Sequence, residues 1–314
     1  MTPAPEHNLN DLLVSRHLRA GRGAQIAVID DLGGWSYDEL DRAAAGAARR
    51  LHDHGVGPGD RVAILLDDSR EWCAAFLGAT RLGAVAAPIE PKGRHLASVL
   101  ADLAPSTVVA ATQPDLPPGS THCALDAPTL LDTPGRPIAA VDRNTPAYMI
   151  FSSGSTGRPK GVVHAHGYLH ASIDGYSVEV LDLQPGDRCH SVAKLFSSLG
   201  FGNGFFRPLG RGATIVLHRG RPNVRTVMQL VAHHGVTILT AVPTFWSQCA
   251  TYLDRHRDPG ALASVRLAVS SGDSLPAAVL QRVTAQTGVD LLEGLGCSEC
   301  SNIVLSTRPG DPHP

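Results

Sequence analysis

The feature that most restricts the fold of this chain is a repeated alternation of short apolar runs with longer helix-like segments. Residues 61–66 (RVAILL) have the composition of a buried strand, residues 70–82 form an amphipathic helical pattern, and residues 84–89 form a second strand. Strands separated by helices of this length are typical of βαβ units and of parallel sheet. Because such crossovers are right-handed, successive units stack into doubly wound layers. The sequence therefore predicts an α/β fold.

The same alternation continues along the rest of the chain. The further expected strands are residues 107–111, 148–151, 213–218, 236–240, 265–270 and 289–292, and the further expected helices are residues 93–103, 223–234, 243–255 and 276–287. Between the two series lies Gln113–Pro146, with seven prolines and little periodicity. We interpret it as a connection between two subdomains, with a short strand or two inside.

Composition excludes several classes of protein. The 314 residues are 43% hydrophobic, enough for a core, and the formal net charge is −2. No basic stripe of the kind that binds nucleic acid is present. No run of about 18 apolar residues occurs, so we expect no membrane span. The first residues lack the apolar core of a signal peptide, which favours a cytoplasmic protein.

Six dispersed cysteines in a chain of this length indicate reduced thiols rather than a disulfide scaffold. Cys297 and Cys300 form one C-x-x-C pair, which is compatible with a redox pair or with half of a zinc site. No second C-x-x-C pair exists, so a four-cysteine zinc site is not supported.

Residues 151–163 (FSSGSTGRPKGVV) place a loop rich in Gly, Ser and Thr between two apolar runs. Such glycines let successive N–H groups point inward as an anion nest, to which hydroxyl groups and Lys160 add donors. A helix expected from about His166 would add a favourable dipole. The spacing is not that of a Walker A loop. A phosphate-binding loop and a solvent-exposed linker remain the two interpretations of these residues alone.

The loop resembles the signature loop of the adenylate-forming superfamily, which comprises acyl- and aryl-CoA synthetases, luciferases and peptide-synthetase adenylation domains. Four further segments resemble motifs of that superfamily in the same order: Trp35–Leu40, Arg81–Pro88, Ser270–Pro276 and Gly294–Glu299. Within the superfamily, residues 193–204 and 305–311 look most like benzoate-type aryl-CoA ligases.

The resemblance implies an AMP-binding domain over residues 1–314, with subdomains of residues 55–190 and of residues 20–54 plus 191–305. It implies attack by a carboxylate on the α-phosphorus of ATP, giving an acyl-adenylate and pyrophosphate, and then a thioester with coenzyme A. A carboxylate is already a nucleophile, so the chemistry needs positioning and charge neutralisation rather than a general base.

The resemblance also implies the roles of individual residues. Lys160, Thr156 and Glu299 would be catalytic, with Glu299 helping to bind Mg²⁺ and Ser298 contacting the α-phosphate. The nucleotide-binding residues would be Ser152, Ser153, Gly154, Ser155, Thr156, Gly157, Lys160, Gly272, Asp273, Ser274, Glu293, Gly294, Leu295, Gly296, Cys297 and Ser298.

Leu295 stands where many members of the superfamily have an aromatic residue, which would replace ring stacking by aliphatic packing. The acid would bind between residues 196–204 and 242–246, and the expected lining residues are Phe196, Ser197, Gly202, His234, Val242 and Pro243. For these residues an ordinary role in core packing remains open.

Motifs that follow in other members of the superfamily do not occur in this sequence: a β-barrel segment, a ribose-binding aspartate, and a small C-terminal domain with a second lysine. We therefore expect an incomplete barrel and weak turnover by this chain. The expected partners are a small aromatic carboxylic acid and coenzyme A. A carrier protein as acceptor, a homodimer, and a non-catalytic nucleotide-binding or acyl-binding homologue all remain open.

Overall fold

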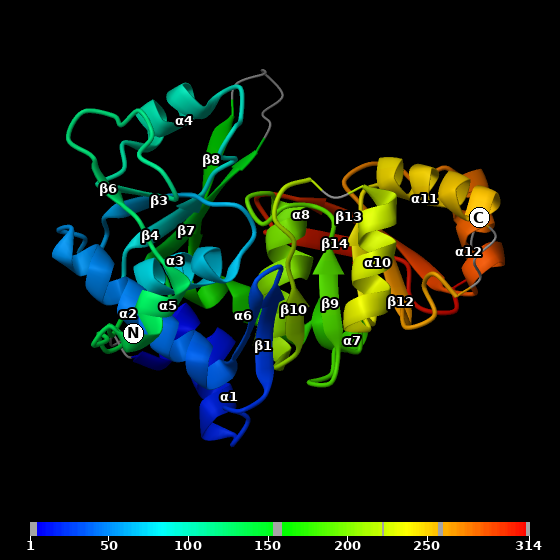
Figure 1. Cartoon of the computed structure of the whole chain (residues 1–314), viewed down its shortest axis with the longest axis horizontal. Coiled ribbons are helices and arrows are strands. Elements are labelled where there is room, and N and C mark those ends of the chain that lie inside the picture. The colour runs from blue at the N-terminus through cyan, green and yellow to red at the C-terminus, as the bar shows by residue number, and fades with distance from the viewer. Residues whose placement is uncertain (1–4, 153–158, 222, 257–259, 312–314) are drawn as a thin grey trace. The chain divides into compact units, whose positions relative to one another are not determined.

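A computed structural model describes residues 5–152, 159–221, 223–256 and 260–311. Contacts divide the chain into two compact units, residues 1–171 and 172–314 (Figure 1). Each unit contains a mainly parallel sheet with helices packed on it. The α/β class expected from the sequence is therefore confirmed. The subdomain ranges stated above stay a proposal.

The sheet of the first unit has strand order β6-β5-β3-β4-β7-β8. Its strands are β3 (Arg61–Leu65), β4 (Val85–Pro88), β5 (Thr107–Ala110), β6 (Thr121–Cys123), β7 (Pro146–Ser152) and β8 (Lys160–Ala165). The pairs β3–β4, β3–β5, β5–β6 and β4–β7 are parallel, and β7–β8 is antiparallel. The predicted glycine-rich loop therefore joins two hydrogen-bonded strands of one hairpin.

Two long helices of the first unit, α2 (Tyr37–Asp53) and α3 (Arg70–Arg81), pack against each other. A Cβ at Gly78 would lie 2.8 Å from Cβ of Ala47, so the glycine permits the close approach. Helix α2 begins with a capping box, in which the Ser36 and Glu39 side chains each accept a backbone N–H of the other residue. The sequence interpretation did not assign α2 as a helix, although this capping signal was present.

The remaining elements of the first unit are short. They are α1 (Arg16–Arg19), β1 (Ile26–Asp30), β2 (Gly33–Ser36), α4 (Leu96–Leu103) and α5 (Ala127–Asp132). Strands β1 and β2 form an antiparallel hairpin. The Pro-rich segment holds β6 and α5, in agreement with the short strand expected there.

In the second unit the strands run in the order β14-β13-β12-β11-β9-β10. They are β9 (Arg188–Ser191), β10 (Thr214–Val216), β11 (Ile238–Ala241), β12 (Leu267–Ser271), β13 (Asp290–Cys297) and β14 (Asn302–Ser306). All of these neighbours pair in parallel except β13 and β14, which form an antiparallel hairpin. The carboxyl ends of the parallel strands therefore lie at one edge, where α/β sheets bind ligands.

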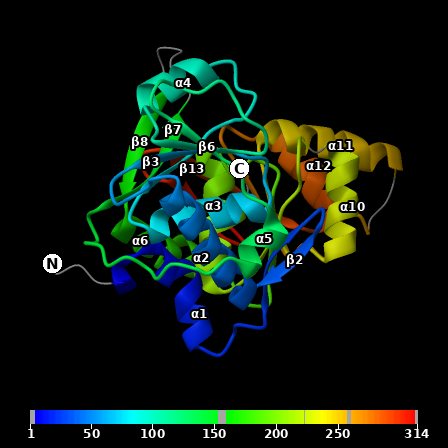
Figure 2. The ribbon, with the colours of Figure 1, turned by 60° about the vertical axis from the view of Figure 1, so that its left-hand side comes forward.

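Helices α10 (Val224–His234), α11 (Pro243–His256) and α12 (Ala277–Thr287) pack together in the second unit (Figures 1 and 2). Alternate strand residues such as Leu239 and Leu291 belong to the core beneath them. Their neighbours Ile238 and Leu292 belong to a second core cluster with Leu181. The strands thus bury both faces, which explains their nearly continuous apolar composition.

Short helical turns complete the second unit: α6 (Leu169–Asp174, which begins in the first unit), α7 (Tyr176–Glu179), α8 (Ser198–Phe201) and α9 (Arg207–Arg211). No closed barrel occurs in the described part of the chain, as expected. None of the helices in the described residues is long and apolar enough to cross a membrane.

Candidate nucleotide-binding site

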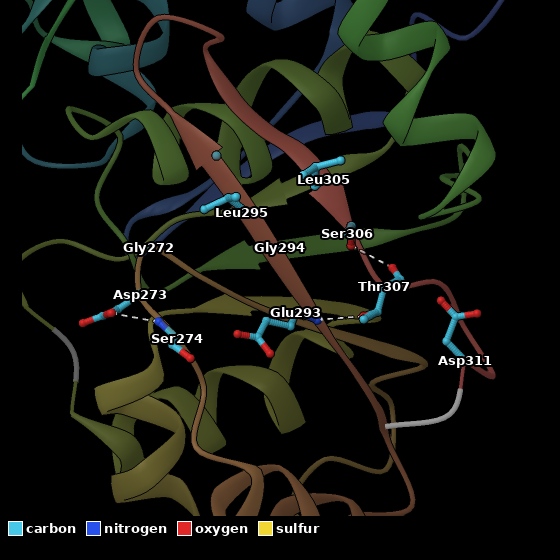
Figure 3. A pocket seen from close by; sticks show the side chains of 11 residues that line it. Gly272, Asp273, Ser274, Glu293, Gly294, Leu295, Leu305, Ser306, Thr307 and Asp311 are labelled. Atoms are coloured by element: carbon cyan, nitrogen blue, oxygen red, sulfur yellow. Dashed lines mark hydrogen bonds between the residues drawn. The ribbon is translucent and has the colours of Figure 1, made fainter. Parts of the chain in front are cut away.

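A cavity of about 780 Å³ opens at the carboxyl edge of the sheet in the second unit. It is lined by Gly272, Asp273, Ser274, Glu293, Gly294, Leu295, Gly296, Leu305, Ser306, Thr307 and Asp311 (Figure 3). The first seven of these residues are among those predicted to bind nucleotide. The structure thus brings together two predicted segments that lie about twenty positions apart in the sequence. Their role in binding stays a prediction.

The loop that follows β12 has a defined shape. Gly272 has a φ of +101°, a conformation that a residue with a side chain rarely adopts. The Asp273 carboxylate accepts a hydrogen bond from the Ser274 N–H at 2.8 Å. The Leu275 N–H donates to the Glu293 carboxylate at 3.1 Å. Glu293 on β13 therefore fixes the position of the loop after β12.

Thr307, the residue after β14, makes hydrogen bonds to Glu293 from the other side of β13. The Glu293 N–H donates to Thr307 Oγ1 at 2.9 Å, and the Thr307 N–H donates to the Glu293 carbonyl at 3.0 Å. The Ser306 hydroxyl donates to the Thr307 carbonyl at 2.7 Å (Figure 3). This reciprocal pair extends the β13–β14 hairpin to the edge of the cavity.

The upper part of the cavity is apolar. Leu295 and Leu305 are cross-strand partners on β13 and β14, and their side chains are 65% and 66% exposed (Figure 3). A Cβ at Gly294 would lie 2.7 Å from Cδ1 of Ile303, so only glycine allows β14 to approach this closely. The two leucines form an exposed aliphatic surface beside polar and acidic groups, a combination that suits a flat heterocycle with polar substituents.

Four lining residues were not assigned a role from the sequence: Leu305, Ser306, Thr307 and Asp311. They were quoted only as part of the resemblance to benzoate-type ligases. Their contribution depends on the antiparallel return of β14 alongside β13, and β14 was not predicted. The short apolar run of residues 303–305, flanked by polar residues on both sides, is the signal that was available.

The predicted residues Cys297, Ser298 and Glu299 lie at the tip of the β13–β14 hairpin and are not among the residues that line the cavity. The Ser301 N–H donates to the Ser298 carbonyl at 3.0 Å and closes a turn, with Ser301 at a φ of +59°. A hydrogen bond with the Cys300 thiol raises the pKa of the Cys297 thiol.

Glu299 is exposed. The described residues contain no group of three or more His, Cys, Asp or Glu able to hold a metal ion. One accessible carboxylate fits a Mg²⁺ ion that is completed by phosphate oxygens and water, rather than an all-protein metal site.

In the first unit, Ser152 and Lys160 are cross-strand partners where β7 ends and β8 begins. The Ser152 hydroxyl donates to the Lys160 carbonyl at 3.4 Å, and the Lys160 side chain is exposed. Residues 153–158, which include the predicted Ser153, Gly154, Ser155, Thr156 and Gly157, lie outside the described residues.

The residues predicted to bind the acid all lie in the second unit. The Ser197 hydroxyl accepts the Gly200 N–H at 3.2 Å and thereby caps α8, and Phe196 before it is half-buried. Gly202 begins a buried π-helical turn. The His234 carbonyl accepts from Arg188 at 2.6 Å at the end of α10.

Val242 and Pro243 lie where β11 meets α11. A Cβ at Gly272 would lie 3.5 Å from Cγ1 of Val242. Val242 therefore adjoins the loop that lines the nucleotide cavity.

This fold and site correspond to one protein family. The family of AMP-binding enzymes matches residues 16–314, which is nearly the whole chain. The chain therefore belongs to the AMP-binding enzyme family.

Individual relatives agree with this membership. The benzoate–CoA ligase of Thauera aromatica is 34% identical over 98% of this chain, and the match spans 62% of that ligase. Among solved structures, a benzoate CoA ligase from Burkholderia xenovorans LB400 superposes with a TM-score of 0.87 at 27% identity, covering 98% of this chain and 64% of that one. The anthranilate CoA ligase AuaEII, solved in complex with anthranoyl-AMP, has a TM-score of 0.87 at 28% identity, with coverage of 98% and 62%.

Proposed function

We propose that this chain binds ATP and an aromatic carboxylic acid and that it belongs to an acid–thiol ligase that converts the acid to an acyl-adenylate and then to a coenzyme A thioester. The chain spans about three fifths of the length of the curated benzoate and hydroxybenzoate ligases that it resembles, so this activity refers to the ligase reaction as a whole. The observation that carries the proposal is the convergence of residues 272–274 and 293–296 on one cavity.

The cavity supports a role in binding the nucleoside part of ATP. Leu295 and Leu305 offer an apolar surface to the base, and the backbone beside Gly272 remains accessible because this exposed residue has no side chain. The acidic groups Asp273 and Glu293 already accept backbone hydrogen bonds, so they act mainly by fixing the walls of the cavity.

The phosphates would be held by groups outside this cavity. Lys160 supplies a positive charge, and the loop that precedes it supplies hydroxyl and N–H donors. Mg²⁺, when bound, supplies further neutralisation of phosphate charge, and Glu299 is the carboxylate proposed to hold it. The attacking carboxylate needs no proton removed, so the task of these residues is orientation and charge neutralisation.

An aromatic acid is favoured over an aliphatic one because relatives at 31–34% identity include ligases named for benzoate, hydroxybenzoates and anthranilate. Val242 is the residue best placed to contact both ligands, since it adjoins Gly272. Phe196, Ser197, Gly202 and Pro243 are proposed to complete the acid site.

Two other functions were open from the sequence: a stand-alone adenylation domain that loads a carrier protein, and a non-catalytic binding protein. No observation on the described residues favours either of them. A carrier protein as the acceptor would leave the adenylation step unchanged, and a non-catalytic binding protein would lack that step. The same first experiment therefore addresses all three functions.

That experiment measures acid-dependent exchange of labelled pyrophosphate into ATP, with a panel of benzoates, aminobenzoates and short aliphatic acids. Binding of ATP and of each acid is titrated in parallel by calorimetry. The proposal expects ATP binding, and a response restricted to aromatic acids. Chains that bind neither ATP nor any aromatic acid would refute it.

A further inference from the structure

Two cysteines at the tip of the β13–β14 hairpin form a pair that the adenylation chemistry does not use. Cys297 ends β13 and is exposed, and Cys300 lies in the following turn and is partly exposed. The Ser301 N–H donates to the Ser298 carbonyl at 3.0 Å and closes the turn between β13 and β14. The hairpin tip therefore places the two cysteines three residues apart, on either side of Ser298 and Glu299.

The other four cysteines differ sharply from this pair. Cys73, Cys123, Cys189 and Cys249 are all buried in the cores of the two units. Oxidation of a thiol depends on its thiolate character and on its exposure to solvent, and burial raises the pKa of all four buried thiols. An oxidant in solution therefore meets Cys297 and Cys300 and not the remaining thiols of the folded chain.

We propose that Cys297 and Cys300 are a redox-active dithiol that a small-molecule disulfide, such as oxidised glutathione, converts to an intramolecular disulfide, and that this oxidation weakens nucleotide binding. The first half of this inference is independent of the proposed function. The second half depends on it.

The reaction is two successive thiol–disulfide exchanges. The thiolate of one cysteine attacks a sulfur of oxidised glutathione, which forms a mixed disulfide and releases one glutathione thiolate. The thiolate of the other cysteine then attacks the protein sulfur of the mixed disulfide and releases the second glutathione. The two cysteines lose two protons and two electrons, and the glutathione disulfide becomes two glutathione thiols.

The consequence for the site follows from where the two cysteines lie. Ser298 and Glu299 stand between them, and these are the residues proposed to contact the α-phosphate and Mg²⁺. A disulfide requires the two sulfur atoms to approach to about 2.05 Å with a fixed dihedral angle, much closer than two sulfur atoms that are not bonded to each other.

The shorter sulfur–sulfur distance has to be accommodated within the ring that the disulfide closes over residues 297–300. The backbone there is already closed by the Ser301–Ser298 hydrogen bond of 3.0 Å and by Ser301 in a left-handed conformation. The turn therefore has to rearrange, and the Glu299 carboxylate moves with it. Exposed disulfides in such rings are the readily reduced ones, so the change would be reversible.

The experiment equilibrates the complete 314-residue chain in buffers of graded oxidised to reduced glutathione, traps free thiols with an alkylating agent, and maps the cysteines by peptide mass spectrometry. We expect one peptide in which Cys297 and Cys300 are joined, appearing in a single two-electron transition that reducing agent reverses. The four buried cysteines should stay alkylatable only after denaturation.

Two variants make the assignment specific. Cys300→Ser should bind ATP like the parent chain and should stop at a mixed disulfide on Cys297. Cys249→Ser, which removes a buried thiol, should leave the transition unchanged. Failure of the 297–300 disulfide to form at any ratio, or a bridge to another cysteine, would overturn the proposal.

ATP titration of the reduced and oxidised chains then tests the consequence. Displacement of a charge-assisted contact corresponds to a loss of about tenfold or more in affinity. Equal affinity of both forms would overturn the effect on binding while leaving the dithiol chemistry intact. A reduced chain that binds no ATP would instead contradict the proposed function, whatever the state of the cysteines.

Discussion

At the scale of the residue, the Glu293 carboxylate shapes the cavity by accepting a backbone hydrogen bond rather than by offering its charge to a ligand. Its carboxylate accepts the Leu275 N–H, and its backbone pairs with Thr307 in both directions. One residue thus ties the loop after β12 and the end of β14 to β13. The side chains that we propose to contact a ligand are instead the exposed ones, above all Leu295 and Lys160.

Leu295→Ala should weaken the binding of ATP and of AMP alike, because both nucleotides contain the base that the leucine surface would contact. Removing part of this exposed aliphatic surface should cost about 1 kcal/mol, or roughly fivefold in affinity. Calorimetric titration of both nucleotides measures the effect. Leu32→Ala is the matched control, since Leu32 is 70% exposed in the first unit, and it should bind as the parent chain does. A loss confined to ATP would contradict a contact with the base.

Lys160→Ala should produce the opposite selectivity. A charge-assisted hydrogen bond to a phosphate contributes about 1.5–3 kcal/mol, so ATP should bind roughly ten- to a hundredfold more weakly. AMP, which lacks the β- and γ-phosphates, should be affected much less. Lys92→Ala removes another exposed lysine of the first unit and serves as the control. Unchanged ATP affinity would remove Lys160 from the proposed phosphate site.

At the scale of the element, the β13–β14 hairpin determines the cavity, and Thr307 is its testable clamp. Thr307→Val keeps the shape of the side chain but removes the acceptor of the partly buried Glu293 N–H, at a cost of about 0.5–1.5 kcal/mol. We expect lower nucleotide affinity together with a lower unfolding midpoint. Thr307→Ser retains the hydroxyl and should restore both. A serine variant as weak as the valine variant would indicate that packing of the methyl group, not the hydrogen bond, matters.

A second element-scale prediction concerns the opposite edge of the same sheet. Arg266 donates to both oxygens of the Asp187 carboxylate at 2.9 and 2.7 Å, and Thr237 donates to it at 2.7 Å. Burial alone would raise the pKa of Asp187, but these hydrogen bonds outweigh it and the pKa is lowered.

Arg266→Met should leave this buried carboxylate without its cation and destabilise the second unit by about 2–3 kcal/mol, allowing for the partial exposure of Arg266. Urea unfolding measures the change. Arg282→Met, which breaks the exposed pair between Arg282 and Asp254 on α12 and α11, should leave the midpoint where it was. Equal losses of unfolding free energy in the two variants would show that the Asp187–Arg266 pair stabilises the unit no more than the exposed Asp254–Arg282 pair does.

Elements also show which parts of the structure could be predicted from the sequence. Most strands and helices of the βαβ units were predictable within a few residues, because the strands are short apolar runs and the helices bury apolar side chains in a regular period. Strand β9 was missed because its residues 188–191 (RCHS) do not form an apolar run. Helix α2 was missed, since its motif was interpreted only as a family resemblance and its Ser36–Glu39 capping box was not used. Strand β14 and Thr307 were missed for a different reason. Their role arises from pairing with Glu293 fourteen residues earlier, and no local pattern encodes that register.

At the scale of the whole molecule, two buried histidines couple folding to pH, one in each unit. Burial lowers the pKa of His166 and of His190 to about 4. His166 Nδ1 accepts the Leu9 N–H at 3.1 Å, a bond that requires this nitrogen to be unprotonated. His190 is further disfavoured as a cation by nearby Lys194, His218 and His234. Both residues are therefore neutral in the folded chain.

Unfolding exposes these histidines and returns each pKa to near 6.5. Between pH 6.5 and pH 4 the unfolded chain binds more protons than the folded chain, so the free energy of unfolding falls as the pH falls. Each histidine contributes up to about 1.4 kcal/mol per pH unit in that window and nothing above it. Urea unfolding at pH 7.5, 6 and 5 should show no change above pH 7 and a progressive loss below pH 6.5.

His190→Gln should flatten this dependence for the second unit and His166→Gln for the first, whatever each variant costs at pH 7.5. The exposed His95 provides the control, because His95→Gln should preserve the slope of the parent chain. A slope that survives in both buried variants would assign the acid sensitivity to carboxylates instead. Because the two histidines belong to different units, the variants also report whether the units lose stability together or separately as the pH falls.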